Sequence, residues 1–131
     1  MSQKLFDEEA LFFDEEDTSA WTASTHNSSS VDQGSGIQDQ LNNGRVVIRW
    51  PGITSGGAAT IQVILADSVD DSTFADVWTS EAYSLANAVT AFGTEFAFDV
   101  PPLQMQRYIR LEIVVGTAAL TGGTLTAGLV K

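Results

Sequence analysis

The chain has 131 residues, of which 44% are hydrophobic, and it contains no cysteine. This length and apolar content suit a single domain with a proper core and exclude a chain that is disordered throughout. Six basic residues against 17 acidic ones give a formal net charge of −11, which repels phosphate backbones and anionic lipid, so we expect no direct binding of nucleic acid or of a membrane.

The N-terminal segment mixes acidic and aromatic residues. Seven acids crowd the first 17 residues, and Phe6, Phe12 and Phe13 lie among them. A short helix and a short strand at residues 11–13 both fit this pattern. The aromatic rings need an apolar partner, which is either the body of this domain or another chain. We predict an acidic aromatic arm over residues 1–20, followed by one domain over residues 21–131. No secretory signal is expected, because a basic region followed by an apolar run is lacking.

The next part of the chain, residues 19–44, is rich in Ser, Thr, Asn and Gly and predicts loops around a weak strand at residues 28–31. Beyond it, alternating segments bounded by glycine and proline predict further strands. These predicted strands cover residues 45–50, 60–66, 77–85 and 94–100. Residues 70–76 predict a turn or a single helical turn, and residues 86–93 predict a connection that could contain a short helix.

Two alternating segments, residues 107–115 and 124–130, end the chain. In the first, Ile109, Leu111 and Ile113 lie on one face, while Tyr108 and Arg110 lie on the other. One face packed on a core and one polar face are typical of antiparallel sheets. We therefore predict an all-β protein, an antiparallel β-sandwich of seven or eight short strands with an extended N-terminal arm.

The same residues carry a family resemblance. The runs RYIRL at 107–111, VVGT at 114–117 and TAGLV at 126–130, with Gly123 between the last two, resemble the C-terminal signature of tailed-bacteriophage capsid cement proteins, also called capsid-stabilising or decoration proteins. A second stretch fits the same family. It runs from AAT at 58–60 through IQVILADS at 61–68 to Asp70, Asp71 and Phe74. The resemblance covers roughly the half of the chain that follows Ala58.

The resemblance implies a jelly-roll fold and a structural role rather than an enzymatic one. A protein of this family is a virion component that binds the exterior of the phage head, after synthesis in the bacterial cytoplasm, and stabilises the shell of the major capsid protein. Its partners would be that capsid protein and further copies of itself, as a homodimer or a homotrimer. The acidic surface suits the outside of the head, away from packaged DNA.

The residues that contact the capsid are inferred from this sequence and not from the family. Phe6, Phe12 and Phe13 are candidate anchors, because they are large aromatic residues within the acidic arm. Tyr108 and Arg110, on the polar face of the strand at 107–115, would suit a polar contact between subunits.

A second hypothesis is a lectin-like jelly roll that binds carbohydrate. Its candidate aromatic platforms are Trp21, Trp50, Trp78, Tyr83 and Tyr108, although the strand positions of Trp50 and Trp78 favour the core. Such a module could depend on calcium held by an acidic group that does not have the spacing of a helix-loop-helix calcium loop. The acidic group comprises Asp67, Asp70, Asp71 and Asp76. The alternative is that these side chains simply cap turns.

Catalysis has little support in the sequence. His26, the single histidine, is near Ser24 and Asp32, which are the residue types of a hydrolase triad. They lie in one polar segment that lacks the rigid geometry a triad needs. We predict no catalytic residue, no metal and no cofactor.

Overall fold

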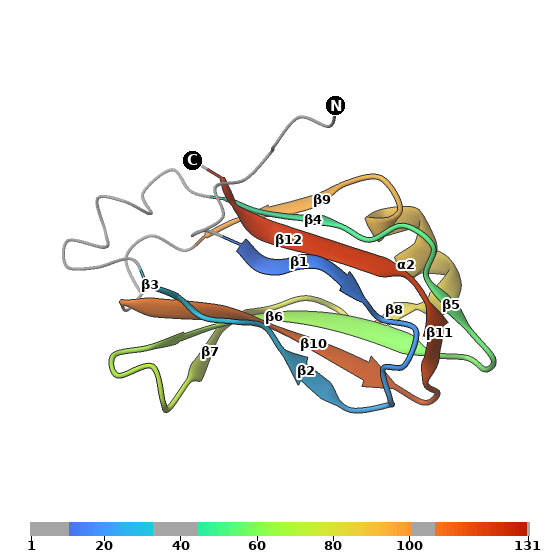
Figure 1. The fold of residues 1–131 in the computed structure, drawn as a ribbon, viewed down its shortest axis with the longest axis horizontal. Coiled ribbons are helices and arrows are strands. Elements are labelled where there is room, and N and C mark those ends of the chain that lie inside the picture. Colours follow the sequence, from blue (N-terminus) through green and yellow to red (C-terminus); the bar gives the residue numbers. More distant parts are fainter. Residues whose placement is uncertain (1–10, 33–44, 101–106, 131) are drawn as a thin grey trace.

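The computed structural model describes residues 11–32, 45–100 and 107–130, and within these ranges two antiparallel sheets lie face to face (Figure 1). The first sheet has the order β1 (Leu11–Asp17), β12 (Thr124–Val130), β4 (Arg45–Arg49) and β9 (Phe96–Asp99). The second sheet has the order β2 (Thr25–Asn27), β10 (Tyr108–Gly116), β6 (Thr60–Ser68) and β7 (Ala75–Thr79). The prediction of an all-β antiparallel sandwich is confirmed.

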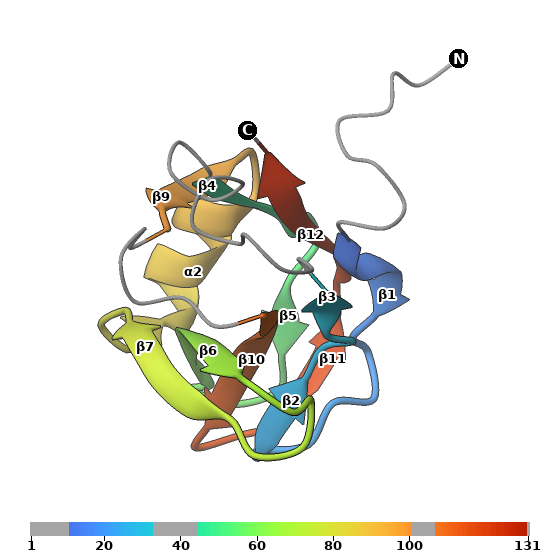
Figure 2. The ribbon, with the colours of Figure 1, turned by 90° about the vertical axis from the view of Figure 1, so that its left-hand side faces the viewer.

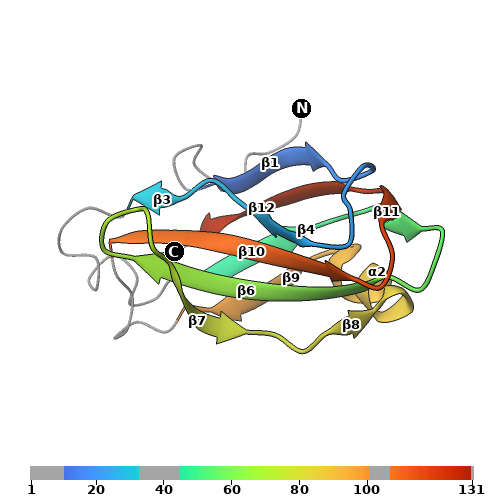
Figure 3. The same cartoon turned by 90° about the horizontal axis from the view of Figure 1, so that it is seen from below.

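Short elements complete the two sheets. In the second sheet, β3 (Val31–Asp32) also pairs with β10, and β8 (Tyr83–Ser84) pairs with β6. At the end of the sandwich where the helix α2 (Leu85–Phe92) also lies, β5 (Thr54–Ser55) pairs with β11 (Leu120–Gly122) in a separate two-stranded sheet (Figure 3). No helix in the described part of the chain is both long and apolar enough to cross a membrane.

Strand pairing is nested along the chain. An early strand pairs with a late one in each case, β1 with β12, β2 with β10, and β4 with β9, and the innermost pair is β6 with β7. β12 also lies beside β4, and β10 lies beside β6. The chain therefore crosses repeatedly from one sheet to the other.

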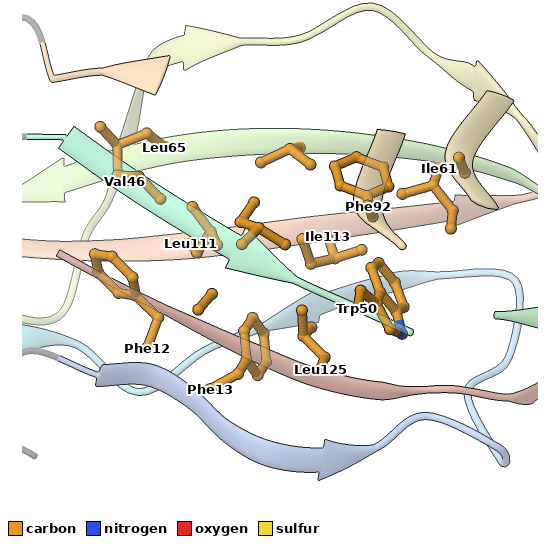
Figure 4. Packing of buried hydrophobic residues seen from close by; sticks show 14 of the residues in the cluster. Phe12, Phe13, Val46, Trp50, Ile61, Leu65, Phe92, Leu111, Ile113 and Leu125 are labelled. Atoms are coloured by element: carbon orange, nitrogen blue, oxygen red, sulfur yellow. The ribbon is translucent and has the colours of Figure 1, made fainter. Parts of the chain in front are cut away.

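The core fills the space between the two sheets. On β6 and β10 the inward positions are fully buried and the positions between them on β10 are half-buried, as the alternating sequence predicts. Val46, Leu125 and Trp50 face these strands from the first sheet (Figure 4). Phe92 of α2 enters the same core at its end, so the helix closes the sandwich.

The predicted strand at 77–85 is wrong as one element. β7 ends at Thr79, because the hydroxyl of Ser80 accepts the backbone N–H of Val63 at 2.9 Å and a side chain replaces part of the regular ladder. The hydroxyl of Ser84 then accepts the N–H of Asn87 at 3.3 Å and caps α2. The predicted strand at 28–31 is also shifted, since β2 and β3 flank Ser28, whose hydroxyl accepts the N–H of Leu111 at 2.9 Å.

The N-terminal domain boundary also requires correction. Residues 11–17 form β1, an edge strand of the first sheet, and thus belong to the sandwich rather than to a separate arm over residues 1–20. Phe12 and Phe13 are only 3% and 6% exposed, and both rings point into the space between the sheets (Figure 4). A bulge between Leu11 and Phe13 breaks the usual alternation and allows two consecutive rings to enter the core.

Candidate interaction surfaces

The structure overturns part of the predicted contact set at the N-terminus. Phe12 and Phe13 are core residues, so they are not available as surface anchors, and the intramolecular interpretation of these two rings is the correct one. Phe6 lies outside the described residues. Its role as an anchor stays a prediction.

Tyr108 and Arg110 lie on the outer face of the second sheet, as predicted. The guanidinium of Arg110 forms an ion pair with Glu112, with 2.8 Å between Nη2 and Oε2, and its Cζ lies 4.1 Å from the centroid of the Phe74 ring. The two charged side chains are 25% and 12% exposed, so the pair is partly shielded from water. Arg110 is thus held rigidly between a carboxylate and an aromatic face.

A second ion pair joins the edge strand β3 to the residue that precedes β10. Arg107 binds the carboxylate of Asp32 through two hydrogen bonds, of 2.8 Å from Nε and 3.0 Å from Nη2. Hydrogen bonding to Asp32 raises the pKa of Arg107 above its ordinary value. The Cζ of Arg107 also lies 5.1 Å from the centroid of the Tyr108 ring. The outer face therefore presents an ordered row of charged and aromatic groups; its contact with a partner stays a prediction.

The edge strands β1 of the first sheet and β2 and β3 of the second approach each other along one side of the sandwich (Figure 2). A groove opens on this side. It has a volume of about 620 Å³ and lies between β1 and the segment that links β2 to β3. Its lining residues are Leu11, Phe12, Phe13, Asp14, Glu16, Asn27, Ser28, Ser29 and Ser30. The sequence offered one signal for it, the acidic run on β1, which fits a solvated surface equally well.

The opposite side of the sandwich is closed by aromatic rings. Trp78 of β7 stacks on Phe98 of β9, with 3.8 Å between the ring centroids and 13° between the ring planes. Tyr83 packs edge-on against Phe92 and Phe96, and burial raises its pKa above the ordinary value of 10.0. These rings serve packing between the sheets.

The remaining tryptophans are also engaged in packing. Trp50 is fully buried, and its Nε1–H donates to the hydroxyl of Thr18 at 3.1 Å. Trp21 is half-buried and stacks on the imidazole of His26, with 4.2 Å between centroids. The prediction that Trp50 belongs to the core is confirmed, and it provides no platform for a sugar.

The acidic segment after β6 is organised as a turn. One carboxylate oxygen of Asp70 accepts hydrogen bonds from the N–H of Thr73 at 3.1 Å, the hydroxyl of Ser68 at 2.8 Å and the N–H of Ser72 at 3.0 Å. These bonds lower the pKa of Asp70 below its ordinary value of 3.8. In the part of the chain that the structure describes, no three acidic or histidine side chains gather as a metal site would require. This geometry matches the turn-capping alternative.

The candidate triad is not assembled. Nε2 of His26 lies 2.9 Å from the carbonyl oxygen of Thr22 and 3.3 Å from the hydroxyl of Ser24. A carbonyl oxygen only accepts, so the shorter contact requires a proton on Nε2, and this nitrogen then cannot take a proton from Ser24. The carboxylate of Asp32 binds Arg107 instead.

Comparison with protein families finds a match to the Bbp16 family over residues 15–129. The chain belongs to the Bbp16 family. The matched range runs from the middle of β1 to the penultimate residue of β12, so it includes the charged outer face of the second sheet and most of the groove lining. Comparison with curated proteins finds no match.

Proposed function

We propose that this protein is a structural component of a tailed-phage virion, a cement or decoration protein that binds the outer surface of the head and stabilises the shell of the major capsid protein. We also propose that its sandwich is a jelly roll. The nested pairing of early with late strands, divided between a four-stranded and a six-stranded sheet, supports this fold assignment.

One observation carries the functional proposal. The C-terminal runs that resemble cement proteins, 107–111, 114–117 and 126–130, lie almost entirely in β10 and β12, which are internal strands of the two sheets. Their apolar members are core residues, whereas Tyr108 and Arg110 lie on the outer face. The resemblance therefore lies in the strands that fix the frame and one outer face of the molecule, which suits a rigid adhesive protein.

The mechanism follows from mass action. A protein that binds the assembled shell but not its separated subunits stabilises the shell in proportion to its occupancy. Self-association as a homodimer or homotrimer would let each particle engage several capsid subunits, and contacts of modest strength would then add up. The net charge of −11 suits the exterior of the head and disfavours contact with packaged DNA.

The lectin-like alternative has less support. Trp50 is inaccessible, Trp78 is stacked on Phe98, and Asp70 is occupied by its own turn. A thermal-shift experiment separates the two functions, because a calcium-dependent lectin gains stability from sugar or calcium and loses it with a chelator. We expect the melting temperature to be unaffected by all three.

Co-sedimentation with mature heads tests the proposal directly. Heads of the phage that encodes the chain, stripped of this protein, should bind it saturably and should then withstand higher temperature before they release DNA. Unexpanded or dissociated capsid protein serves as the control and should bind weakly. Absence of binding to mature heads, or binding without any gain in their heat stability, would contradict the proposal.

A further inference from the structure

We infer that the groove between β1 and residues 27–30 binds an extended segment of a partner protein that carries lysine or arginine side chains. The inference names the recognition element for the capsid partner proposed above and rests on that proposed function only for the identity of the partner. Three features of the groove support the inference, namely its unpaired strand edge, its polar lining and its charge.

Two strand edges border the groove. β1 is hydrogen-bonded to β12 on one side, and β2 and β3 are hydrogen-bonded to β10 on one side. Within the described ranges no strand pairs with the other side of any of them. The groove is lined by β1 on one side and, on the other, by Asn27 at the end of β2 and the serines at 28–30 that lead to β3. Free backbone N–H and C=O groups of an edge strand are a template for an added extended segment.

The lining selects the chemistry of that segment. The volume of about 620 Å³ lies in the range of functional binding sites. Asp14 and Glu16 line the groove and are exposed, and ionised carboxylates only accept hydrogen bonds, so they require cationic donors. Asn27 and the serines at 28–30 offer neutral donors and acceptors to a peptide backbone.

The remainder of this chain is a poor occupant. Residues 1–10 contain three acids and a single lysine, and residues 33–44 contain one acid and no basic residue. A second copy would bring a net charge of −11, and three of its six basic residues, Arg49, Arg107 and Arg110, are already in ion pairs. Charge complementarity therefore points to a different protein.

The irregular backbone of β1 adds to the selectivity for a different protein over a second copy of this chain. Register shifts at Leu11/Phe13 and Phe13/Glu16 interrupt the strand, and Glu15 has a φ of 50°. Bulges and acidic side chains protect an edge against pairing with other copies of the chain. The acidic side chains repel another copy of this acidic chain but attract a cationic segment. The edge of β1 therefore disfavours self-pairing and favours a basic partner.

A basic peptide tests the groove without any phage component. The probe is an acetylated and amidated octapeptide of alternating lysine and threonine, titrated into the isotope-labelled full chain and followed by amide chemical shifts. We expect saturable shifts confined to β1 and residues 27–30, with affinity that falls as salt rises. The double variant Asp14→Asn/Glu16→Gln should lose at least about threefold in affinity.

Two further variants make the test specific. Asp71→Asn/Glu81→Gln makes the same change in net charge at exposed sites away from the groove and should leave the affinity unchanged. Ser29→Trp fills the groove without a change in charge and should abolish the shifts, with the amide spectrum showing that the variant is folded. Equal weakening by both double variants, or undiminished binding by Ser29→Trp, would overturn the inference.

The same variants on heads separate the inference from the proposed function. If the wild type binds heads and Asp14→Asn/Glu16→Gln binds them equally well, the groove inference fails and the function stands. If the wild type does not bind heads but binds the peptide in the groove, the proposed function fails and the groove inference stands.

Discussion

Gly123 occupies a position where backbone and side chains meet closely. Its φ is +124°, and a Cβ there would lie 2.7 Å from both Thr18 Oγ1 and Trp50 Nε1. These two atoms form the buried hydrogen bond that anchors the indole. The N–H of Thr18 also donates to the carbonyl of Gly123 at 3.0 Å. One residue without a side chain thus allows the end of β1 and the start of β12 to close over Trp50.

Gly123→Ala should therefore destabilise the protein, by about 1–3 kcal/mol from backbone strain, with the clash adding to it. Gly56→Ala is the matched control, because a Cβ at Gly56 meets nothing within 4 Å, and it should change stability by less than about 0.5 kcal/mol. Urea unfolding measures both variants. If the two variants have the same free energy of unfolding, the close contact at Gly123 is relieved without loss of stability, and this explanation is wrong.

Asp70 links stability to pH. Its folded pKa is depressed below 3.8, first by the N–H of Thr73 and then by Ser68 and Ser72. A depressed pKa contributes stability that is fully present above the unfolded value and is lost as the pH falls through the folded value. The wild type should exceed Asp70→Asn in the free energy of unfolding at neutral pH, and the difference should shrink below pH 3.8. A difference that is constant over this range would contradict the assignment.

At the scale of elements, β1 is part of the folded domain. The strand contributes Phe12 and Phe13 to the core and lies beside β12 over its length. Phe13→Ala should cost about 3–5 kcal/mol, because it empties a space between packed sheets. Asp14→Ala, one residue further on and exposed, should cost less than about 0.5 kcal/mol. Similar unfolding midpoints for the two variants in urea would show that β1 is not part of the core.

The sequence predicted those elements whose alternation is regular. The strand at 124–130 has the predicted bounds, and β6 and β10 differ from prediction by two residues or fewer at each end. Prediction failed where a side chain competes with the backbone, as Ser80 and Ser84 do, and where the bulge in β1 breaks the period of two. The bond of Ser80 to Val63 and the bulge of β1 against β12 depend on partners distant in the chain, so no local pattern reveals them. The cap that Ser84 forms with Asn87 is local.

The candidate surfaces were predictable to different degrees for the same reason. Tyr108 and Arg110 were placed on the outer face because alternation alone determines the face of a strand. The ring of Phe74 against Arg110 and the groove beside β1 arise from segments separated by many residues. The acidic residues of β1 predict a negatively charged surface, but they do not predict that the surface is concave. Only the concave shape distinguishes a groove from a solvated strand edge.

At the scale of the whole molecule, the packed sheets and the negative charge both suit a protein that acts by adhesion. One hydrophobic core packs the two sheets together, and the net charge of −11 is carried on the surface and in the segments outside the described ranges. Such a molecule has little capacity for large movement but can present the same faces at every copy of a symmetric lattice. A protein that acts by adhesion needs this property, because each binding site must be met in the same geometry.

Electron cryomicroscopy of the intact phage particle tests this account most directly. It should show a two-layer β-sandwich on the outside of the head, repeated at one class of symmetry position and in contact with neighbouring major capsid subunits. Heads that carry no such density, or density for this protein within the DNA-filled interior, would contradict it.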